Sequence, residues 1–258
     1  MTAARSTSGA LLRSAPLLGI LVIAGLAVLL QWAIGAGIVD EYTVPRPTEI
    51  VAALPRLIFE EHVASRFLVT AAETFAAGTL ATLAGTALGA ALYHWPRMRR
   101  AFEPWVAVLA AAPLVLAYPL FLVLFGRSSA TVVVIAFASA LPPVVLQTVA
   151  GFSAVRPVLL AVGRSFGLGC AAEFRHVLLP AALPSVFTGL RLALMFSLIN
   201  VVGVEFLINL GGLGALINDL SERYDLPGTW AAIGFVVLVS VSFFVVLDGG
   251  ERWLRRRG

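Results

Sequence analysis

The sequence predicts an all-α, polytopic membrane protein with six membrane-spanning helices. Of its 258 residues, 60% are hydrophobic and only 12% are charged, and the mean hydropathy is +0.96. A soluble domain carries about 45–50% apolar and about 25% charged residues, so this chain has too few polar side chains to coat a soluble core. Long apolar stretches recur from end to end, which favours a single transmembrane domain over residues 1–258.

Six windows approach or exceed the roughly 20 apolar helical residues that cross a hydrocarbon core of about 30 Å. They are Ala15–Val39, Phe67–Tyr93, Pro104–Phe125, Ala130–Gly151, Val186–Leu210 and Thr229–Leu247. The first is longer than the apolar core of a signal peptide, about 7–15 residues, and is expected to stay as a helix. In the second, Gly78, Gly85 and Gly89 allow close approach of neighbouring helices. Pro113 and Pro119 in the third and Pro142–Pro143 in the fourth are expected to kink those helices.

The basic residues predict the orientation of the chain. All 18 are arginines, and the formal net charge is +4. If the N-terminus is cytoplasmic, twelve arginines fall in inner segments and five in outer ones, so the positive-inside rule places both termini in the cytoplasm. These arginines lie in short clusters between apolar runs, so no nucleic-acid partner is expected. The absence of lysine excludes a P-loop for ATP, and the single cysteine, Cys170, excludes an intrachain disulfide.

Two loops between the windows are long enough to carry structure. In the outer loop, residues 40–66, Thr48 is expected to cap a short helix with one apolar stripe. The stripe is Ile50, Leu54, Leu57 and Ile58. It predicts a helix that lies on the outer membrane surface or against the other helices. The inner loop, residues 152–185, is too polar to span and too apolar for a simple linker, and a structured loop of this length is usually functional.

The inner loop carries a spaced motif. Gly167 is followed by nine residues, then by Val177, one residue and Leu179-Pro180. This spacing resembles the cytoplasmic signature of ABC-importer permeases, in which E-A-A, three residues and a glycine precede nine residues and I-x-L-P. Ala161-Val-Gly163 occupies the E-A-A positions, so only the glycine and the Val-x-Leu-Pro part match directly.

The resemblance extends from about residue 43 to the C-terminus. Pro45-Arg-Pro-Thr-Glu-Ile50 resembles the Pro-x-Pro-x-Glu segment of the nitrate/sulfonate/taurine branch of these permeases. The stretches Ala181–Pro184, Gly189–Leu194 and Gly211–Ile217 continue the likeness. The chain is therefore identified as a member of that branch. The resemblance implies the type I ABC importer permease fold and a place in the bacterial cytoplasmic (inner) membrane.

The resemblance also implies a division of work between several proteins. Two permease subunits, as a homodimer or heterodimer, would form the pathway within membrane lipid. Cytoplasmic ABC ATPase subunits would bind ATP and magnesium, and an external solute-binding protein would deliver a small solute. This chain itself would hold no cofactor, metal or catalytic residue, and its loop 152–185 would couple to the ATPase. The candidate coupling residues are Ala161, Gly163, Arg164, Gly167, Cys170, Phe174, Arg175, Val177, Leu179 and Pro180.

The residue types of the loop fit this role. Gly167 is expected to join two short helices at a close packing distance. Pro180 and Pro184 are expected to end the second helix before the chain re-enters the membrane. The alternative interpretation is that Gly167 is an ordinary turn and that the arginines of the loop only mark the cytoplasmic side.

Three ionisable residues fall inside the windows, where such groups are functional candidates. Arg191 lies near the cytoplasmic end of its window and is expected to snorkel to the interface. Glu205 lies about 8 Å from the outer end of its helix, at 1.5 Å per residue, with Asn209 one turn later. We expect this pair, together with Arg127, to shape an outer gate or a helix contact. Glu73 is a further candidate for the gate or pathway.

Two other classes of protein have weaker support. For an enzyme, the three histidines lack H-E-x-x-H spacing and no serine stands in G-x-S-x-G. A secondary transporter also needs helices and intramembrane charge, but it needs no ATPase-docking loop and often shows internal repeats, which are not evident here.

Overall fold

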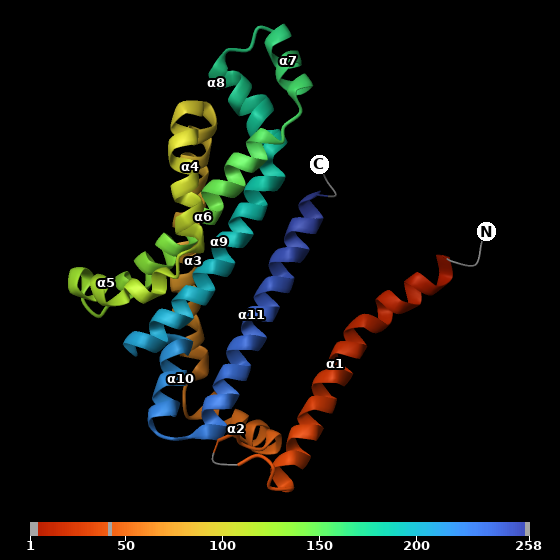
Figure 1. Cartoon of the computed structure of the whole chain (residues 1–258), viewed down its shortest axis with the longest axis vertical. Coiled ribbons are helices and arrows are strands. Elements are labelled where there is room, and N and C mark those ends of the chain that lie inside the picture. Colours follow the sequence, from red (N-terminus) through yellow and green to blue (C-terminus); the bar gives the residue numbers. More distant parts are fainter. Residues whose placement is uncertain (1–4, 41–42, 256–258) are drawn as a thin grey trace.

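The computed structural model describes residues 5–40 and 43–255, and every regular element in these ranges is a helix (Figure 1). The α-helices are α1 (Arg5–Gly35), α2 (Pro47–Phe59), α3 (Val63–His94), α4 (Pro96–Ala111), α5 (Tyr118–Phe125), α6 (Ser129–Ser153), α7 (Pro157–Ser165), α8 (Cys170–Glu173), α9 (Leu179–Ile208), α10 (Gly212–Glu222) and α11 (Leu226–Arg255). Two short elements complete the order, the 3₁₀-helix η1 (Leu114–Ala117) and the π-helix η2 (Phe174–Leu178).

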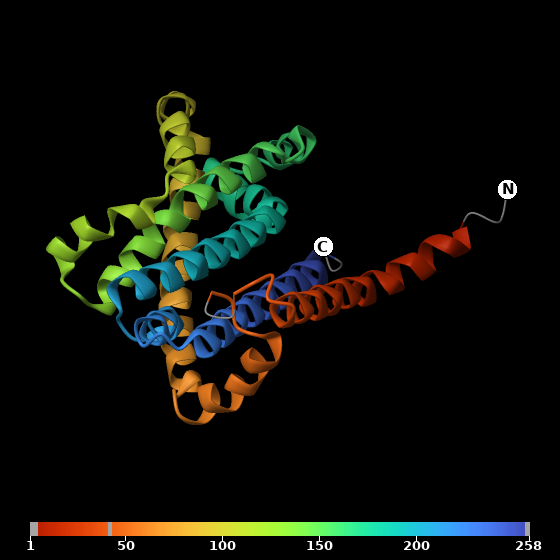
Figure 2. The same ribbon diagram turned by 60° about the horizontal axis from the view of Figure 1, so that its bottom comes forward.

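Helices α3, α6 and α9 form the packed centre, and α6 lies against both of the others (Figures 1 and 2). Their shared surface is made of small and β-branched side chains that are fully buried. These are Ala77, Val132, Ile135, Ala136, Val201 and Val204. A Cβ atom at Gly85 would lie 2.7 Å from Val144, and one at Gly89 would lie 2.6 Å from Thr148. The close helix approach predicted for these glycines is therefore confirmed.

Four helical runs in the described residues are long and apolar enough to cross a membrane. They contain α3, α6, α9 and α11. The third predicted window is wrong as a single helix, because it divides into α4 and an arm, Leu114–Phe125, that is bent by 84° from it. Counted together, these two arms would add a fifth span. The first window falls on α1, whose described apolar part is only Leu21–Gly35, so the six-span count stays a prediction.

Proline has different effects in the third and fourth windows. Proline disfavours helical backbone in the residue before it, and Ala112 is extended, with φ −75° and ψ 131°. By contrast, α6 continues through Pro142 and Pro143. Many residues of α6 are buried, including Pro142, whereas neither α4 nor η1 contains a buried residue. Helix α4 nevertheless continues through Pro104, so burial alone does not decide where a proline breaks a helix.

The long helices have two distinct ends (Figure 1). Helices α7 and α8 project at one end, which we call the loop end, and α2 and α10 cover the opposite end, which we call the α10 end. Helix α1 packs against α2 and stands away from the central helices in both views (Figures 1 and 2). Part of the predicted orientation rests on Arg5, Arg13 and the arginines at 252–257, whose side chains lie outside those described.

Helix α2 packs on α10 and α11 through a narrower face than the predicted stripe. Ala53 and Leu57 are buried in a cluster with residues of α10 and α11. Leu54 and Ile58, which the stripe included, are 37% and 53% exposed. The helix also begins before Thr48, so this residue is not the predicted cap.

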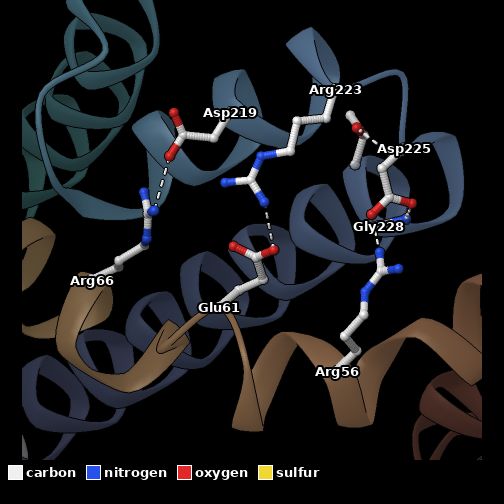
Figure 3. Close-up of polar contacts among 8 residues, drawn as sticks. Arg56, Glu61, Arg66, Asp219, Arg223, Asp225 and Gly228 are labelled. Atoms are coloured by element: carbon white, nitrogen blue, oxygen red, sulfur yellow. Dashed lines mark hydrogen bonds and ion pairs between the residues drawn. The ribbon is translucent and has the colours of Figure 1, made fainter.

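Ion pairs tie the α2–α3 corner to α10 and to the turn that leads into α11 (Figure 3). They are Arg56–Asp225, Glu61–Arg223 at 2.8 Å and Arg66–Asp219 at 2.8 Å. Asp225 also accepts a hydrogen bond from the Gly228 N–H over 3.1 Å, which orders the start of α11. These pairs cross between segments more than 150 residues apart, so they fix the α10 end as one unit.

Candidate functional site

The loop between α6 and α9 folds into two short helices at the loop end (Figure 1). Helix α7 begins after Arg156, with Pro157 in its first turn, where the missing N–H leaves no hydrogen bond unmade. Helix α8 continues through the π-helix η2 into α9. The predicted functional loop is therefore a compact helix pair and not a linker.

Gly167 ends α7 in the left-handed conformation, with φ +73°. Its N–H donates to the Arg164 carbonyl over 2.9 Å. The Leu168 N–H donates to the Gly163 carbonyl over 3.3 Å, and the two bonds together form a Schellman motif. The predicted permissive backbone at Gly167 is confirmed. The predicted close packing is wrong at Gly167, because a Cβ atom there would meet nothing within 4 Å. Close packing occurs instead at Gly163, which is buried and where a Cβ atom would lie 3.3 Å from Val177.

Arg164 bridges α7 and α8. Its Nε and Nη2 atoms lie 3.2 and 3.4 Å from the two carboxylate oxygens of Glu173. The hydrogen bond to Glu173 is the main cause that raises the pKa of the Arg164 guanidinium above its ordinary value. The side chain of Arg164 is 70% exposed, so this contact orders the helix pair while it stays open to water and salt.

Aromatic side chains anchor the loop to the central helices. The Phe174 ring lies 5.8 Å from that of Phe152 in an edge-to-face arrangement. Phe152, at the end of α6, is buried and also contacts Tyr93 of α3 at 5.6 Å. Leu178 of η2 is buried in the same cluster. A displacement of the loop would therefore act on α3 and α6 directly.

Pro180 and Pro184 do not end a helix, so that prediction is wrong. Helix α9 runs through both prolines to Ile208. Just before them η2 has the wider turn of a π-helix, in which the Leu179 N–H donates to the Phe174 carbonyl five residues earlier. Pro180 then falls in the first turn of α9, where its missing N–H is tolerated. Helical backbone thus connects the loop to a span that reaches the α10 end.

An exposed apolar stripe runs along α7. Val158, Val162 and Phe166 follow one another at four-residue spacing and are 57%, 49% and 81% exposed. They form an apolar face at the tip of the loop end. The sequence interpretation missed this face because apolar residues are common throughout the chain. Their regular spacing within a loop that also carries polar residues was the available signal.

The other candidate coupling residues divide into exposed and partly buried positions. Exposed residues are Ala161, Cys170, Arg175 and Pro180, and partly buried ones are Phe174, Val177 and Leu179. A cavity of about 530 Å³ lies between the loop and the α3–α4 corner. Its lining includes Tyr93, His94, Arg99, Arg164, Cys170 and Glu173. The loop therefore packs against the central helices through its partly buried residues and presents its exposed residues to the surroundings.

At the α10 end, Glu205 is a fully buried carboxylate. The Thr70 hydroxyl lies 2.8 and 2.9 Å from its two oxygens. The Gly214 N–H donates to one of these oxygens over 2.8 Å, and the Leu213 N–H donates to the Thr70 hydroxyl over 2.8 Å. Glu205 of α9 and Thr70 of α3 thus satisfy two backbone N–H groups at the start of α10 that have no partner inside the helix. Glu205 makes a contact between three helices.

Glu73 lies next to this contact and is only 5% exposed. Ser129 and Glu205 are polar neighbours of Glu73, but the two carboxyl oxygens of Glu73 are buried without a hydrogen-bond partner. Asn209 ends α9 in the left-handed conformation, and its carbonyl accepts a hydrogen bond from Arg127. Arg127 therefore contacts the backbone of Asn209 and not Glu205.

Over residues 5–40 and 43–255, no three His, Cys, Asp or Glu side chains form a group that could hold a metal ion.

Arg191 is paired inside the bundle. Its Nη1 atom lies 3.1 Å from Asp248 of α11, and its guanidinium lies 4.5 Å from the centre of the Phe244 ring. The two charged side chains are 24% and 22% exposed. Helix α11 thus brings a counter-ion to Arg191, which the sequence did not predict, and the expectation that Arg191 snorkels to the interface stays a prediction.

Comparison with known proteins agrees with this arrangement. The sequence model of the family described as "Binding-protein-dependent transport system inner membrane component" matches residues 81–257. The chain belongs to this permease family. Among related permeases, the "Taurine transport system permease protein TauC" of Escherichia coli (strain K12) is 27% identical over 177 residues, which are 69% of this chain and 63% of that one. The "Nitrate import permease protein NrtB" of Leptolyngbya laminosa is 31% identical over 162 residues, covering 63% and 58%.

The "Riboflavin transport system permease protein RibX" of Chloroflexus aurantiacus is 29% identical over 163 residues, covering 63% of this chain and 61% of that permease. The chain thus spans about three fifths of the length of these curated relatives. In fold it is similar to the inward-facing "MetNI methionine ABC transporter", with a TM-score of 0.65, 19% identity and coverage of 74% and 94%. An "amino acid ABC transporter with histidines" gives a TM-score of 0.63 at 21% identity, covering 77% and 97%. The predicted type I ABC importer permease fold is confirmed.

Proposed function

We propose that this chain is the membrane permease subunit of an ATP-driven ABC importer and that residues 152–185 form its coupling loop. The observation that carries the proposal is the exposed stripe Val158, Val162 and Phe166 on an ordered helix pair. An apolar face with this exposure fits a cleft on a protein partner. Membership of the family supports an importer and disfavours the secondary transporter, which would need no such face.

The loop has the contacts that a coupling element needs. The Schellman motif at Gly167 and the Arg164–Glu173 pair keep α7 and α8 together as one body. Phe174 and Leu178 transmit its movement to α3 and α6, and the continuous backbone through η2 transmits it to α9. ATP-driven closure of two ATPases would draw two such loops together and shift the bundle between inward and outward states.

The cluster at the α10 end supports a gate at the far end of the same helix. Glu205 joins α9 to α3 and to the start of α10, and Asn209 ends α9 beside it. A shift of α9 along its axis would therefore act on the position of α10. We assign Glu73, Glu205 and Asn209 to this gate.

The proposal requires several partners. Two cytoplasmic ABC ATPase subunits bind ATP and magnesium, so this chain needs no cofactor of its own. A second permease subunit, identical or related, completes the pathway, and an external binding protein delivers a small solute. None of the three gate residues is basic, and Arg127 engages the carbonyl of Asn209, so we assign solute selectivity mainly to the binding protein.

The docking stripe can be tested with two phenylalanines of similar exposure. Phe166 at the loop end is 81% exposed and Phe59 at the α10 end is 78% exposed. Phe166→Ser should weaken association with the ATPase that co-purifies from the native host by about 30-fold, the value for loss of a 2 kcal/mol hot spot. Phe59→Ser should leave this association unchanged. Normal ATPase association in the Phe166 variant would overturn the docking assignment.

The orientation can be tested with the single thiol. Cys170 is exposed in the loop that we place in the cytoplasm. An impermeant thiol reagent should fail to label it in intact cells and should label it in inverted vesicles stripped of ATPase. Added ATPase should then protect it. Labelling of Cys170 from outside intact cells would overturn the orientation.

A further inference from the structure

Two buried carboxyl groups are neighbours at the α10 end, and only one of them has hydrogen-bond partners. Glu205 of α9 is 0% exposed and accepts hydrogen bonds from the Gly214 N–H and the Thr70 hydroxyl. Glu73 of α3 is 5% exposed, and both of its carboxyl oxygens are buried without a partner. An ionised carboxyl is costly in such a place, because neither water nor a protein donor stabilises its charge.

The backbone directs Glu73 toward Glu205. Thr70 and Glu73 are three residues apart on α3, so they lie on one face of this helix. From that face Thr70 reaches the Glu205 carboxyl at 2.8 Å, which places Glu73 beside the same carboxyl. The other polar neighbour of Glu73 is Ser129, at the start of α6.

The charged side chains on the surrounding elements are engaged elsewhere. Arg66 of α3 lies 2.8 Å from Asp219 of α10, so these two charges neutralise each other. Arg127, which precedes α6, donates to the Asn209 carbonyl at the end of α9. Within residues 5–40 and 43–255, neither carboxyl of the pair makes an ion pair with a basic side chain.

Two carboxylates in contact inside a protein do not both stay ionised, because each repels the charge of the other where water cannot screen it. The donors decide which group keeps the negative charge. The Gly214 N–H and the Thr70 hydroxyl stabilise a carboxylate at Glu205, whereas Glu73 has no donor. A metal ion fits the pair poorly, since the Gly214 N–H points its positive end at an oxygen that the metal would need. A proton on Glu73 has no such conflict.

A cavity of about 400 Å³ at the α10 end adjoins the pair. Its lining includes Asn209, Gly211, Gly212 and Asp219. Gly212 forms the wall between this cavity and Glu205, since a Cβ atom at Gly212 would overlap the Glu205 carboxyl. A small shift of α10 is therefore enough to bring water to the pair.

We propose that Glu73 and Glu205 form a proton-binding site, which holds one proton on Glu73 while α3, α9 and α10 are packed together. Separation of α9 from α3 hydrates both carboxyls, and Glu73 then becomes a carboxylate as its proton passes to water. Because we place both residues in the gate, the closed gate binds a proton that the open gate releases, and a rise in pH at this end favours opening. This last step rests on the proposed function, whereas the proton site does not.

Infrared spectroscopy of the purified permease, in a detergent without carbonyl groups, tests the site. A protonated carboxylic acid has a C=O stretching band that carboxylates lack, and exposed acids, with pKa values of about 4, are ionised at about pH 6.5. The wild-type permease should show this band, with a shift in D2O. Glu73→Gln should remove the band, and the matched control Glu60→Gln, at an exposed glutamate, should keep it.

Three infrared results would overturn the proposal. The first is absence of the band from the wild-type permease, which needs no variant to be folded. The second is persistence of the band in Glu73→Gln. The third is loss of the wild-type band when sodium or calcium ions are added, which would identify a cation in place of the proton.

The pH dependence of stability is a second measurement. Above about pH 5 the folded permease holds a proton that the same carboxyl lacks in the unfolded chain, so its stability falls as pH rises. One extra proton changes the folding equilibrium about tenfold per pH unit, or about 3–6 °C in apparent Tm for a chain of this size. Between about pH 6 and pH 7 the Tm of the wild type should fall by this amount more than that of Glu73→Gln, whose amide donates to Glu205 without a titrating proton.

Equal pH slopes of Tm in these two proteins would also overturn the proposal. Both measurements use the permease without ATPase or solute. A failure of the proposed transport function would therefore leave them unchanged, and the two failures can be told apart.

Discussion

The two polar clusters that lie at opposite ends of α9 are built in opposite ways. At the α10 end, Glu205 is 0% exposed, and Thr70 and Gly214 surround its carboxylate. At the loop end, Arg164 is 70% exposed and its partner Glu173 is 16% exposed. The first cluster replaces the hydration of a carboxyl group by protein donors, whereas the second leaves the Arg164 guanidinium largely hydrated.

This difference indicates what each end of α9 contributes. Removal of a buried carboxylate leaves donors unsatisfied in a dry interior, while removal of one partner of a surface pair leaves the other partner solvated. The cluster at the α10 end should therefore govern stability. The cluster at the loop end should govern association with a partner. Substitutions at the two ends test this separation.

Replacement of Glu205 by leucine should have the largest effect. The Gly214 N–H loses its acceptor, whereas the Thr70 hydroxyl keeps the Arg66 carbonyl at 3.3 Å, and one unsatisfied buried group costs about 1–3 kcal/mol. At about 2–4 °C per kcal/mol for a chain of this size, the apparent Tm in detergent should fall by roughly 2–12 °C. An unchanged Tm would show that the cluster does not hold the fold together.

Glu205→Gln is the matched control for this substitution. The amide oxygen can still accept a hydrogen bond from Gly214, so Tm should fall by less than half as much as in the leucine variant. Uptake should become slower in the assembled transporter while the same solute is carried. A change in solute preference would instead make Glu205 a substrate contact.

Most of the central fold could be predicted from the sequence because its signals are local. The windows around α3, α6, α9 and α11 follow from apolar length alone, and Gly85 and Gly89 mark the contact between α3 and α6. The sequence alone does not distinguish the helix break at Pro113 from the unbroken helix at Pro142, because both residues are proline. Burial of α6 accompanies its continuity at Pro142, but α4 also continues through Pro104 without a buried residue, so burial alone does not separate the two outcomes either.

The candidate site was predictable where the backbone itself carries the signal. Gly167 was recognised from its motif, and its positive φ explains why glycine stands there. The surroundings of Glu205 were not predictable, because Thr70 is 135 positions away in the sequence. The pairing of Arg191 with Asp248 was missed for the same reason. The stripe that includes Phe166 was missed because exposure cannot be read from apolar residues in a chain where such residues predominate.

Gly167→Val should have an intermediate effect, confined to the loop end. A β-branched side chain at φ +73° costs about 1–2 kcal/mol and disrupts the end of α7. Transport and ATPase association should fall, while membrane insertion and the cluster at Glu205 stay intact. Gly169→Val is the matched control, because Gly169 has φ −72° and open space around its Cβ position. Identical behaviour of the two variants would show that the left-handed residue has no role in coupling.

Arg164→Gln should have the smallest effect on stability and is the most specific test of the comparison. Its guanidinium is 70% exposed, and a glutamine can still donate a hydrogen bond to Glu173, so Tm should fall by no more than a few degrees. Association of the wild-type permease with its ATPase should weaken with added salt, because the Debye length falls from about 10 Å at 0.1 M to about 3 Å at 1 M. If the ion pair orders the docking face, the association of the Arg164→Gln variant with the ATPase should depend less on salt. The double variant Arg164→Gln/Glu173→Gln should show the same salt dependence as Arg164→Gln alone. A Tm change as large as that of the Glu205→Leu variant would contradict the division between a stabilising end and an associating end of α9.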